Sequence, residues 1–431
     1  MKEYNLKSPI AVQLELTHTC NHRCDYCYNA DALVPKLEKE LSKEHFLAIT
    51  QLLIDKEIFH LTLTGGEPYI RKDVVYDVLG LAYANNIKLG INTNLTVNLE
   101  KQDFEKLAGL KTKVLTSMPS YKKDEYNRIT ASKDYDKFIG NLETAVNEGL
   151  SISVNTVITQ ENKEDVYDSG RFLAGLEVKS YNATPMVPAT ACHRSLAIGP
   201  KDVVKVLDDL LAVQKDFGMR VDLLEPMPLC ILPDLEKYKQ FTKRNCMAGK
   251  TTAYVNPYGD MRPCGRLQGS AGNILTEPFE KVWTDAMASW KGGKYFPQEC
   301  SPCGVKEACS GGCRVHATTV LGKIDGKSPW AQDPISSNAQ PLSKFEFDSS
   351  QTYSVNPDIL YREERPNTYT LYNSPAILIV NTEFLNLFKV LAKERHFDVE
   401  NVAAKYGLDR EKLKSICSLL LNRKLIERGK E

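Results

Sequence analysis

Three cysteines stand close together near the start of the chain. Cys20, Cys24 and Cys27 are separated by three and two residues. Three thiolates at this spacing can hold three irons of a 4Fe–4S cube and leave the fourth iron open to another ligand. Zinc is the alternative, because His18 or His22 could supply the fourth ligand that a closed zinc site prefers. The spacing favours the cluster and leaves the zinc alternative open.

A second motif, Thr-Gly-Gly-Glu-Pro, spans residues 64–68. Two adjacent glycines let a backbone approach a ligand closely, and exposed carbonyl groups can accept hydrogen bonds from an ammonium group. Alone, a Gly-Gly pair is most often a turn. Because this motif follows a second expected strand downstream of the three cysteines, Gly65, Gly66 and Glu67 are candidate ligand-binding residues.

Alternating strands and helices are expected around these motifs. The strand-like segments are residues 11–16, 60–64, 88–92, 113–116, 151–158 and 178–183, with helical patterns between them. In the first of these helical patterns, residues 42–56, the apolar side chains of Phe46, Ile49 and Leu53 share one face. Six such repeats predict an α/β fold in which a parallel sheet curls fully or partly into a barrel. Chemistry in such folds gathers at the carboxyl ends of the strands, where both motifs lie.

Together the two motifs resemble the radical S-adenosylmethionine (radical SAM) superfamily over residues 11–186. The resemblance implies a partial (β/α)6 barrel with a 4Fe–4S cluster on the three cysteines. It also implies that S-adenosylmethionine binds the open iron, with its amino group along Gly65, Gly66 and Glu67. Reductive cleavage of the bound molecule would then give a 5′-deoxyadenosyl radical that removes a hydrogen atom from the substrate.

Four further cofactor contacts are suggested by the same resemblance. Tyr26 would lie near the adenine, and Asn92, with Asn94, ends the third strand where the family often has Thr-Asn-Gly. Ser117 would reach the ribose, although Met118 and Pro119 follow it in place of the usual Asp-Gly. Arg128 is a candidate for the carboxylate, and an ordinary surface arginine is the alternative.

A second cysteine array lies in the region that follows. After Cys246 and Cys264, the spacing Cys-x2-Cys-x5-Cys-x3-Cys places cysteines at 300, 303, 309 and 313. Such a quartet indicates metal binding, and one or two zinc sites are the alternative. The array resembles the SPASM extension of radical enzymes over about residues 230–336, which holds two auxiliary iron–sulfur clusters.

The SPASM resemblance also implies which cysteines share a cluster. The first auxiliary cluster would use Cys246, Cys264 and Cys313, with Cys230 as its fourth thiolate, and the second would use Cys300, Cys303 and Cys309. The pattern usually ends in Asp-Pro-x-Cys, but residues 333–336 read Asp-Pro-Ile-Ser. Ser336 therefore stands where a cysteine is expected, and we expect the second cluster to be the incomplete one. Of the remaining cysteines, Cys417 fits an apolar helix face, and Cys192 is a loop thiol or a substrate contact.

The end of the chain forms a separate module in this interpretation. Residues 357–431 show three short strands and then three helices, which predicts a small winged-helix-like α+β domain. This module resembles the PqqD-like precursor-recognition elements, which bind a leader peptide at a sheet edge. A DNA-binding winged helix is the alternative, although residues 401–431 hold only eight Lys/Arg against four Asp/Glu. The expected domains are 1–190 (barrel), 191–345 (cysteine-rich), 346–356 (linker) and 357–431.

The composition indicates which partners and which cellular compartment to expect. Lys+Arg and Asp+Glu both number 55, so the balanced charge gives no general reason to expect nucleic acid or a membrane surface. We find no signal peptide and no apolar stretch of about 18 residues, and we expect a cytoplasmic protein. In that setting twelve cysteines favour metal ligation over disulfides.

These observations predict a radical SAM peptide maturase. It would act on a ribosomally made precursor peptide, form a thioether or carbon–carbon cross-link, and take electrons from a donor such as flavodoxin or ferredoxin. A sulfatase-maturing enzyme that makes formylglycine is one alternative, disfavoured by the missing cysteine and the extra module. A zinc-containing, DNA-binding regulator is the other.

Overall fold

The structure, a computed structural model, describes residues 5–29, 39–336, 347–373, 376–394 and 396–429. The chain divides into two compact units, Met1–Gln340 and Pro341–Glu431. Each unit has its own buried apolar core. The two units are therefore described separately.

A ten-stranded sheet organises the larger unit, in the order β10-β9-β8-β1-β2-β3-β4-β5-β6-β7. The first six strands along the chain are parallel neighbours. Their bounds are β1 Ala11–Glu15, β2 His60–Thr64, β3 Lys88–Asn92, β4 Lys113–Ser117, β5 Ile152–Ile158 and β6 Ser180–Pro185. The sheet ends at β10 and β7 without closing, so the prediction of an α/β partial barrel is confirmed.

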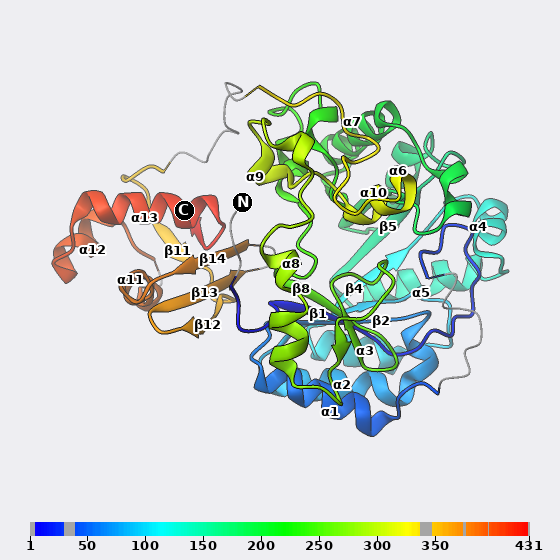
Figure 1. Ribbon diagram of the computed structural model, residues 1–431, viewed down its shortest axis with the longest axis horizontal. Helices are drawn as coiled ribbons and strands as arrows, with labels where there is room; N and C mark the ends of the chain where they lie inside the picture. Colours follow the sequence, from blue (N-terminus) through cyan, green and yellow to red (C-terminus); the bar gives the residue numbers. More distant parts are fainter. Residues whose placement is uncertain (1–4, 30–38, 337–346, 374–375, 395, 430–431) are drawn as a thin grey trace. The chain divides into compact units, whose positions relative to one another are not determined.

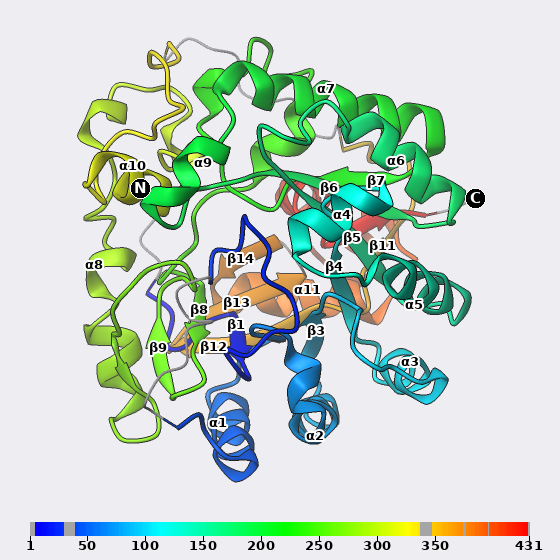
Figure 2. The same ribbon diagram turned by 90° about the vertical axis from the view of Figure 1, so that its right-hand side faces the viewer.

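Helices surround the outer face of this sheet in an arc (Figure 2). They are α1 Lys43–Asp55, α2 Lys72–Ala84, α3 Lys101–Gly109, α5 Tyr135–Asn147, α6 Val166–Gly175 and α7 Pro200–Phe217, whereas α4 Lys123–Thr130 lies inside this arc in the same view. The expected apolar face of α1 is buried, because Phe46, Ile49 and Leu53 have no exposed surface. Burial of such a face against the sheet, at about 25 cal/mol per Å², is what holds an amphipathic helix in place.

Four more strands extend the sheet beyond the six expected ones. They are β7 Arg220–Asp222, β8 Thr252–Val255, β9 Asp260–Arg262 and β10 Gly272–Asn273. Strand β8 comes from the cysteine-rich region and pairs in parallel with β1, with Ala11 opposite Thr252 (Figure 1). The sheet therefore crosses the expected boundary at residue 190. The buried Trp283 indole adds a further link, because its Nε1 donates to the Leu6 carbonyl oxygen at 3.0 Å.

Short helices carry much of the rest of the cysteine-rich region. They include η4 Leu229–Ile231, α8 Ala288–Lys291, η7 Gln298–Cys300, α9 Lys306–Cys309 and α10 Arg314–Leu321. Cysteines lie within or beside four of these helices. The local backbone is thus shaped around thiols as well as around apolar side chains.

The smaller unit is an α+β module. Its antiparallel sheet has the order β12-β13-β14, formed by Leu360–Arg365, Thr368–Asn373 and Ala376–Val380. Helices α11 Thr382–Lys393, α12 Val399–Tyr406 and α13 Arg410–Asn422 follow, each capped at its N-terminus by an Asn or Asp side chain. This is the expected order of three strands and three helices, and Cys417 is fully buried in its core.

One pairing in this unit was not expected. Strand β11, Tyr353–Val355, pairs with β15, Ile426–Arg428, at the end of the chain. Tyr353 is fully buried in the core of the smaller unit. Residues 353–355, expected in the linker, are therefore an integral part of this unit. Part of the expected linker, residue 346, lies outside the described residues.

Candidate functional site

The loop after β1 carries the first three cysteines. Two backbone hydrogen bonds hold it against the end of α4: Arg23 N to Thr130 O at 3.0 Å and Asp25 N to Ile129 O at 3.2 Å. All twelve cysteines of the chain are free thiols. The loop therefore presents Cys20, Cys24 and Cys27 as partly buried, unoxidised side chains.

Burial governs the acidity of these thiols. It raises the pKa of Cys20 to about 11 and that of Cys24 to about 12, and it also raises the pKa of Cys27. Neighbouring acids, including Cys27 beside Cys20, add to this effect. Such thiols need a positively charged partner before they can act as thiolates, which an iron–sulfur cluster supplies.

The zinc alternative fits this loop less well. His22 Nε2 already contacts Asp134 Oδ2 at 3.1 Å and Thr96 Oγ1 at 3.0 Å, and His18 Nε2 contacts Glu15 Oε2 at 3.2 Å. Among the described residues, no three Cys, His, Asp or Glu side chains gather closely enough to hold a single metal ion. Each thiolate of a four-iron cube binds a different iron, so such thiolates stand farther apart than the ligands of one zinc ion.

The Gly-Gly-Glu motif packs directly against the cysteine loop. Gly66 N donates to Thr17 O at 2.7 Å, and Glu67 N donates to Thr19 O at 2.9 Å. A Cβ atom would lie 2.6 Å from Thr17 O at Gly65 and 2.2 Å from Thr19 O at Gly66. The glycines are thus required for a close approach between two backbone segments, in addition to the approach to a ligand that we expected.

Glu67 joins this motif to the end of β3. Its buried carboxylate accepts hydrogen bonds from Tyr69 N at 3.1 Å, Thr93 Oγ1 at 2.8 Å and Asn94 N at 2.7 Å. Burial raises its pKa to about 7, although these hydrogen bonds work in the opposite direction. A carboxyl group held in this way fixes the relative positions of two loops that meet at the carboxyl edge of the sheet.

Asn94, in the loop that follows β3, contacts the first cysteine loop. Its Nδ2 donates to Asn21 Oδ1 at 2.8 Å and lies 3.9 Å from Cys20 Sγ. Asn92, the expected contact, is the last residue of β3, two positions earlier. The Thr-Asn pair at 93–94 was the available signal, and Leu95 follows it with φ 58°, where the resembling family has glycine.

The other expected cofactor contacts lie on neighbouring elements. Ser117 is the last residue of β4 and is partly exposed. The Tyr26 hydroxyl interacts with the Cys24 thiol, and burial raises the pKa of that hydroxyl well above its usual value. Arg128, on α4, donates from Nη2 to Glu161 Oε2 at 2.7 Å with its side chain 53% exposed. The roles of these three residues toward a cofactor stay predictions.

One auxiliary group of thiols consists of Cys246, Cys264 and Cys313. Burial raises the pKa of Cys264 to about 11 and that of Cys313 further still, and the nearby Glu225 carboxylate adds to both shifts. Arg266 pairs with Glu225 at 2.7 Å, and its guanidinium lies 5.4 Å from the centre of the Tyr28 ring. Since Tyr28 follows Cys27, this arginine connects the group to the first cysteine loop.

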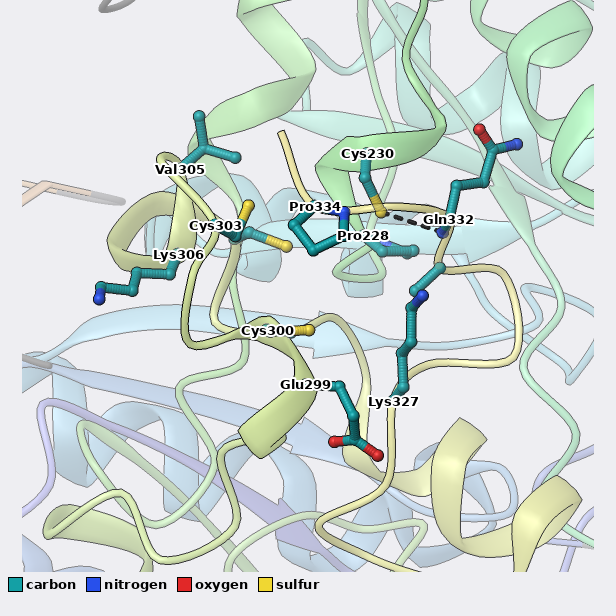
Figure 3. Close-up of a pocket in the computed structure, with 13 residues that line it drawn as sticks. Pro228, Cys230, Glu299, Cys300, Cys303, Val305, Lys306, Lys327, Gln332 and Pro334 are labelled. Carbon is teal, nitrogen blue, oxygen red and sulfur yellow. Dashed lines mark hydrogen bonds between the residues drawn. The ribbon is translucent and has the colours of Figure 1, made fainter. Parts of the chain in front are cut away.

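The second auxiliary group has four thiols. Cys230, Cys300, Cys303 and Cys309 all line one pocket. Figure 3 shows the thiols of Cys230, Cys300 and Cys303 directed toward the same space, Cys230 from one segment and the other two from another. We expected Cys230 beside Cys246, and the structure corrects this: the turn at η4 brings Cys230 to the other group.

Neither Ser336 nor Cys192 lines the pocket of the second group, although the Ile335 carbonyl oxygen, just before Ser336, accepts a hydrogen bond from Gly304 N at 2.9 Å. Residues Ala331, Gln332 and Pro334 line the pocket of the second group, whereas the exposed Ser336 is not among its lining residues. The exposed Cys192 thiol lies 2.9 Å from Thr190 Oγ1. The Thr190 hydroxyl is therefore a local hydrogen-bond partner of the Cys192 thiol.

Comparisons with known proteins agree with this geometry. Residues 14–173 match the family model of the Radical SAM superfamily, and residues 246–304 match the SPASM model, an iron–sulfur cluster-binding domain. The protein is a radical SAM enzyme with a SPASM domain. Its cofactors are accordingly 4Fe–4S clusters and S-adenosylmethionine, which fits the free thiols and the Gly-Gly-Glu loop. The matches favour this enzyme class over a zinc-containing DNA-binding regulator.

Several relatives resemble this radical SAM enzyme over most of its length. An AdoMet-dependent heme synthase of Methanosarcina barkeri is 24% identical over 75% of this chain and 96% of its own. A PqqA peptide cyclase of Xanthomonas euvesicatoria is 26% identical over 84% of this chain and 97% of its own.

Solved structures share the fold. Streptococcus suis SuiB bound to its precursor peptide SuiA has a TM-score of 0.63 at 16% identity, over 76% of this chain and 77% of its own. SuiB bound to S-adenosylmethionine has a TM-score of 0.62 at 17% identity, over 75% and 77%. Among the described residues, no helix is both long and apolar enough to cross a bilayer.

Proposed function

We propose that this radical SAM enzyme is a peptide maturase that forms a thioether or carbon–carbon cross-link in a ribosomally made precursor peptide. The observation that carries the proposal is the smaller unit, whose sheet has one blunted and one open edge. Relatives named PqqA peptide cyclase and the peptide-bound SuiB structure support the same class of substrate. The sulfatase-maturing alternative accounts for no part of the smaller unit.

Strand β12 forms the blunted edge. Its register with β13 is irregular between Glu363 and Arg365. Arg362 and Glu364 are nearly fully buried and pair at 2.7 Å. A bulge and inward-pointing charges are features by which natural sheets prevent another strand from pairing with an edge.

Strand β14 has none of these features. Its sequence, Ala-Ile-Leu-Ile-Val, is regular and uncharged, and in the described part of the chain it pairs only with β13. Ile379 is 38% exposed on this strand. An extended leader peptide that added to β14 would gain backbone hydrogen bonds from the edge and apolar contact from Ile379.

The larger unit supplies the reactive site in this proposal. When bound, the reduced cluster and S-adenosylmethionine supply a carbon-centred radical for hydrogen abstraction. Cys20, Cys24 and Cys27 would hold the cluster, and Gly65, Gly66 and Glu67 would orient the methionine end of the cofactor. Tyr26, Asn92, Ser117 and Arg128 are the further cofactor contacts to test. The enzyme would take single electrons from a flavodoxin or ferredoxin and would act in the cytoplasm.

Two matched variants test the peptide-binding edge. The probes are peptides encoded by short reading frames beside the gene, titrated by calorimetry. Ile379→Asp should weaken binding about tenfold or more, equivalent to about 1.4 kcal/mol. Tyr361→Asp, at a comparably exposed apolar residue of β12, is the control and should change affinity little. Equal effects, or no binding of any such peptide, would contradict the assignment of β14.

The reaction itself is tested by mass spectrometry. With reductant and S-adenosylmethionine, the bound peptide should lose the mass of two hydrogen atoms, as a new intramolecular bond requires, and fragmentation should show two residues joined to each other. Formylglycine made from serine loses the same mass, but the change then lies on a single residue that reacts with a hydrazide, and this product would identify the sulfatase-maturing alternative.

A further inference from the structure

We propose that Cys230 is the fourth thiolate of the auxiliary cluster held by Cys300, Cys303 and Cys309. The auxiliary site without a fourth cysteine is then the one at Cys246, Cys264 and Cys313. This inference concerns ligand sets and does not rest on the proposed peptide substrate. It reverses the sequence expectation, which placed Cys230 at the first site and left the second incomplete.

The pocket around Cys230 carries the argument. Four thiols from three chain segments line it: Cys230 from η4, Cys300 and Cys303 from η7 and the turn that follows, and Cys309 from α9. Leu229 N donates to Cys309 Sγ at 3.4 Å, so the residue before Cys230 contacts another thiol of the group. The backbone next to Cys230 therefore contacts a thiol of this group directly.

A second contact explains how Cys230 can stand in for the missing cysteine. Gln332 N donates to Cys230 Sγ at 3.2 Å (Figure 3). Gln332 directly precedes the Asp-Pro-Ile-Ser segment, from which the usual final cysteine would come. The Cys230 thiol therefore occupies the side of the pocket that this segment faces, while the Ser336 side chain is exposed to solvent.

Charge around the pocket suits a fully thiolate-ligated cluster. Lys306, Lys327 and Glu299 line the pocket, so positive charge exceeds negative charge by one among these three side chains. Four thiolates place more negative charge on a cluster than three, and a nearby ammonium offsets part of it. At the three-thiol site the neighbouring ion pair is instead Glu225 with Arg266.

Single and double variants of the full, anaerobically reconstituted chain test the grouping. The readouts are iron per chain and the electron paramagnetic resonance spectrum of the reduced protein, with Cys192→Ala as the control outside both groups. Cys230→Ala and Cys300→Ala should each remove the same spectral component, with a loss of up to about four irons. The double variant Cys230→Ala/Cys300→Ala should lose no more than either single variant, because both residues act on one cluster. Cys230→Ala/Cys246→Ala should affect two components.

Two results would overturn the proposal: a spectral component shared by Cys230 and Cys246, and unchanged iron and spectra in Cys230→Ala. Restoration of the Cys230→Ser cluster by Ser336→Cys would instead support it, because both positions would then serve the same cluster. Cys230→Ser, with nearly the same size, replaces Cys230→Ala if the alanine variant folds poorly by thermal melting, and the same outcomes apply.

Discussion

Gly66 offers the smallest substitution that should disconnect the two cofactor-binding motifs. A Cβ atom at this position would lie 2.2 Å from Thr19 O and 2.6 Å from His18 O. Both are backbone atoms just before Cys20, so no side-chain rotation relieves the overlap. Reaching ordinary van der Waals contact requires a shift of about 1 Å in one of the two segments. The hydrogen bond from Glu67 N to Thr19 O at 2.9 Å would weaken with it.

A displacement of this size should affect catalysis more than stability. Overpacking typically costs about 1–3 kcal/mol, whereas a misplacement of about 1 Å at a reactive site can cost about 100-fold in rate. We therefore expect Gly66→Ala to fold with a melting temperature a few degrees lower and to form 5′-deoxyadenosine about 100-fold more slowly under dithionite. Thermal melting and chromatography of the product measure the two effects, and the iron content per chain shows whether the variant carries the same clusters as the wild type.

A matched glycine provides the control for this experiment. Gly80 lies in α2, and a Cβ atom there would meet nothing within 4 Å. Gly80→Ala should therefore stabilise the protein by about 0.5–1 kcal/mol and leave the rate unchanged. If Gly66→Ala kept the wild-type rate, the packing of the Gly-Gly motif against the cysteine loop would not position the cofactor.

Substitutions of two charged side chains, Glu67 and Arg266, give two further tests. The folded-state pKa of Glu67 is raised to about 7, so its contribution to stability is complete below its unfolded value of 4.5 and is lost as pH rises toward 7. The resulting change in the free energy of unfolding is about 3 kcal/mol. Glu67→Gln should therefore flatten the decline in melting temperature between about pH 5 and 8. If the variant declined like the wild type, Glu67 would not be the cause of the decline. Arg266→Gln should leave the partly exposed Glu225 carboxylate unpaired, destabilise the protein by about 1–3 kcal/mol and lower the reduction potential of the adjacent auxiliary site. Thermal melting and a redox titration measure the two effects, and an unaltered potential would separate Arg266 from that site.

The barrel was predictable because its signals are local. Buried parallel strands are short apolar runs, and each crossover helix shows an apolar face at helical spacing. Phe46, Ile49 and Leu53 are buried as that pattern predicts. The three strands and three helices of the smaller unit were predictable for the same reason.

The pairings between distant segments were not predictable. Strand β8 has four residues and pairs with β1, which lies more than two hundred residues earlier. The pairing of β11 with β15 likewise joins two three-residue strands. Neither segment carries a local pattern that specifies its partner, because register is determined by the three-dimensional context.

The candidate site likewise contains residues that local sequence predicts and residues that only the fold brings together. Gly65, Gly66 and Glu67 were recognisable because the site requires those residue types at adjacent positions. Thr93 and Asn94, the partners of Glu67, directly follow β3, the next strand along the sheet, so topology rather than spacing brings them to Glu67. The ion pair of Glu225 with Arg266 had no sequence signal, since each residue alone resembles an ordinary surface charge.

Cys230 shows why spacing alone assigns ligands incompletely. Ordered along the chain, Cys230 precedes Cys246 and was grouped with it. In space, η4 brings it to the segment at Gln332 that leads to Ser336. The presence of Cys230 and the absence of a cysteine at position 336 are therefore explained together. The segment at η4 supplies the thiolate that the segment ending at Ser336 lacks. It follows that the auxiliary site with an open iron adjoins Arg266 and Tyr28, and so lies on the side connected to Cys27 and the radical-forming loop.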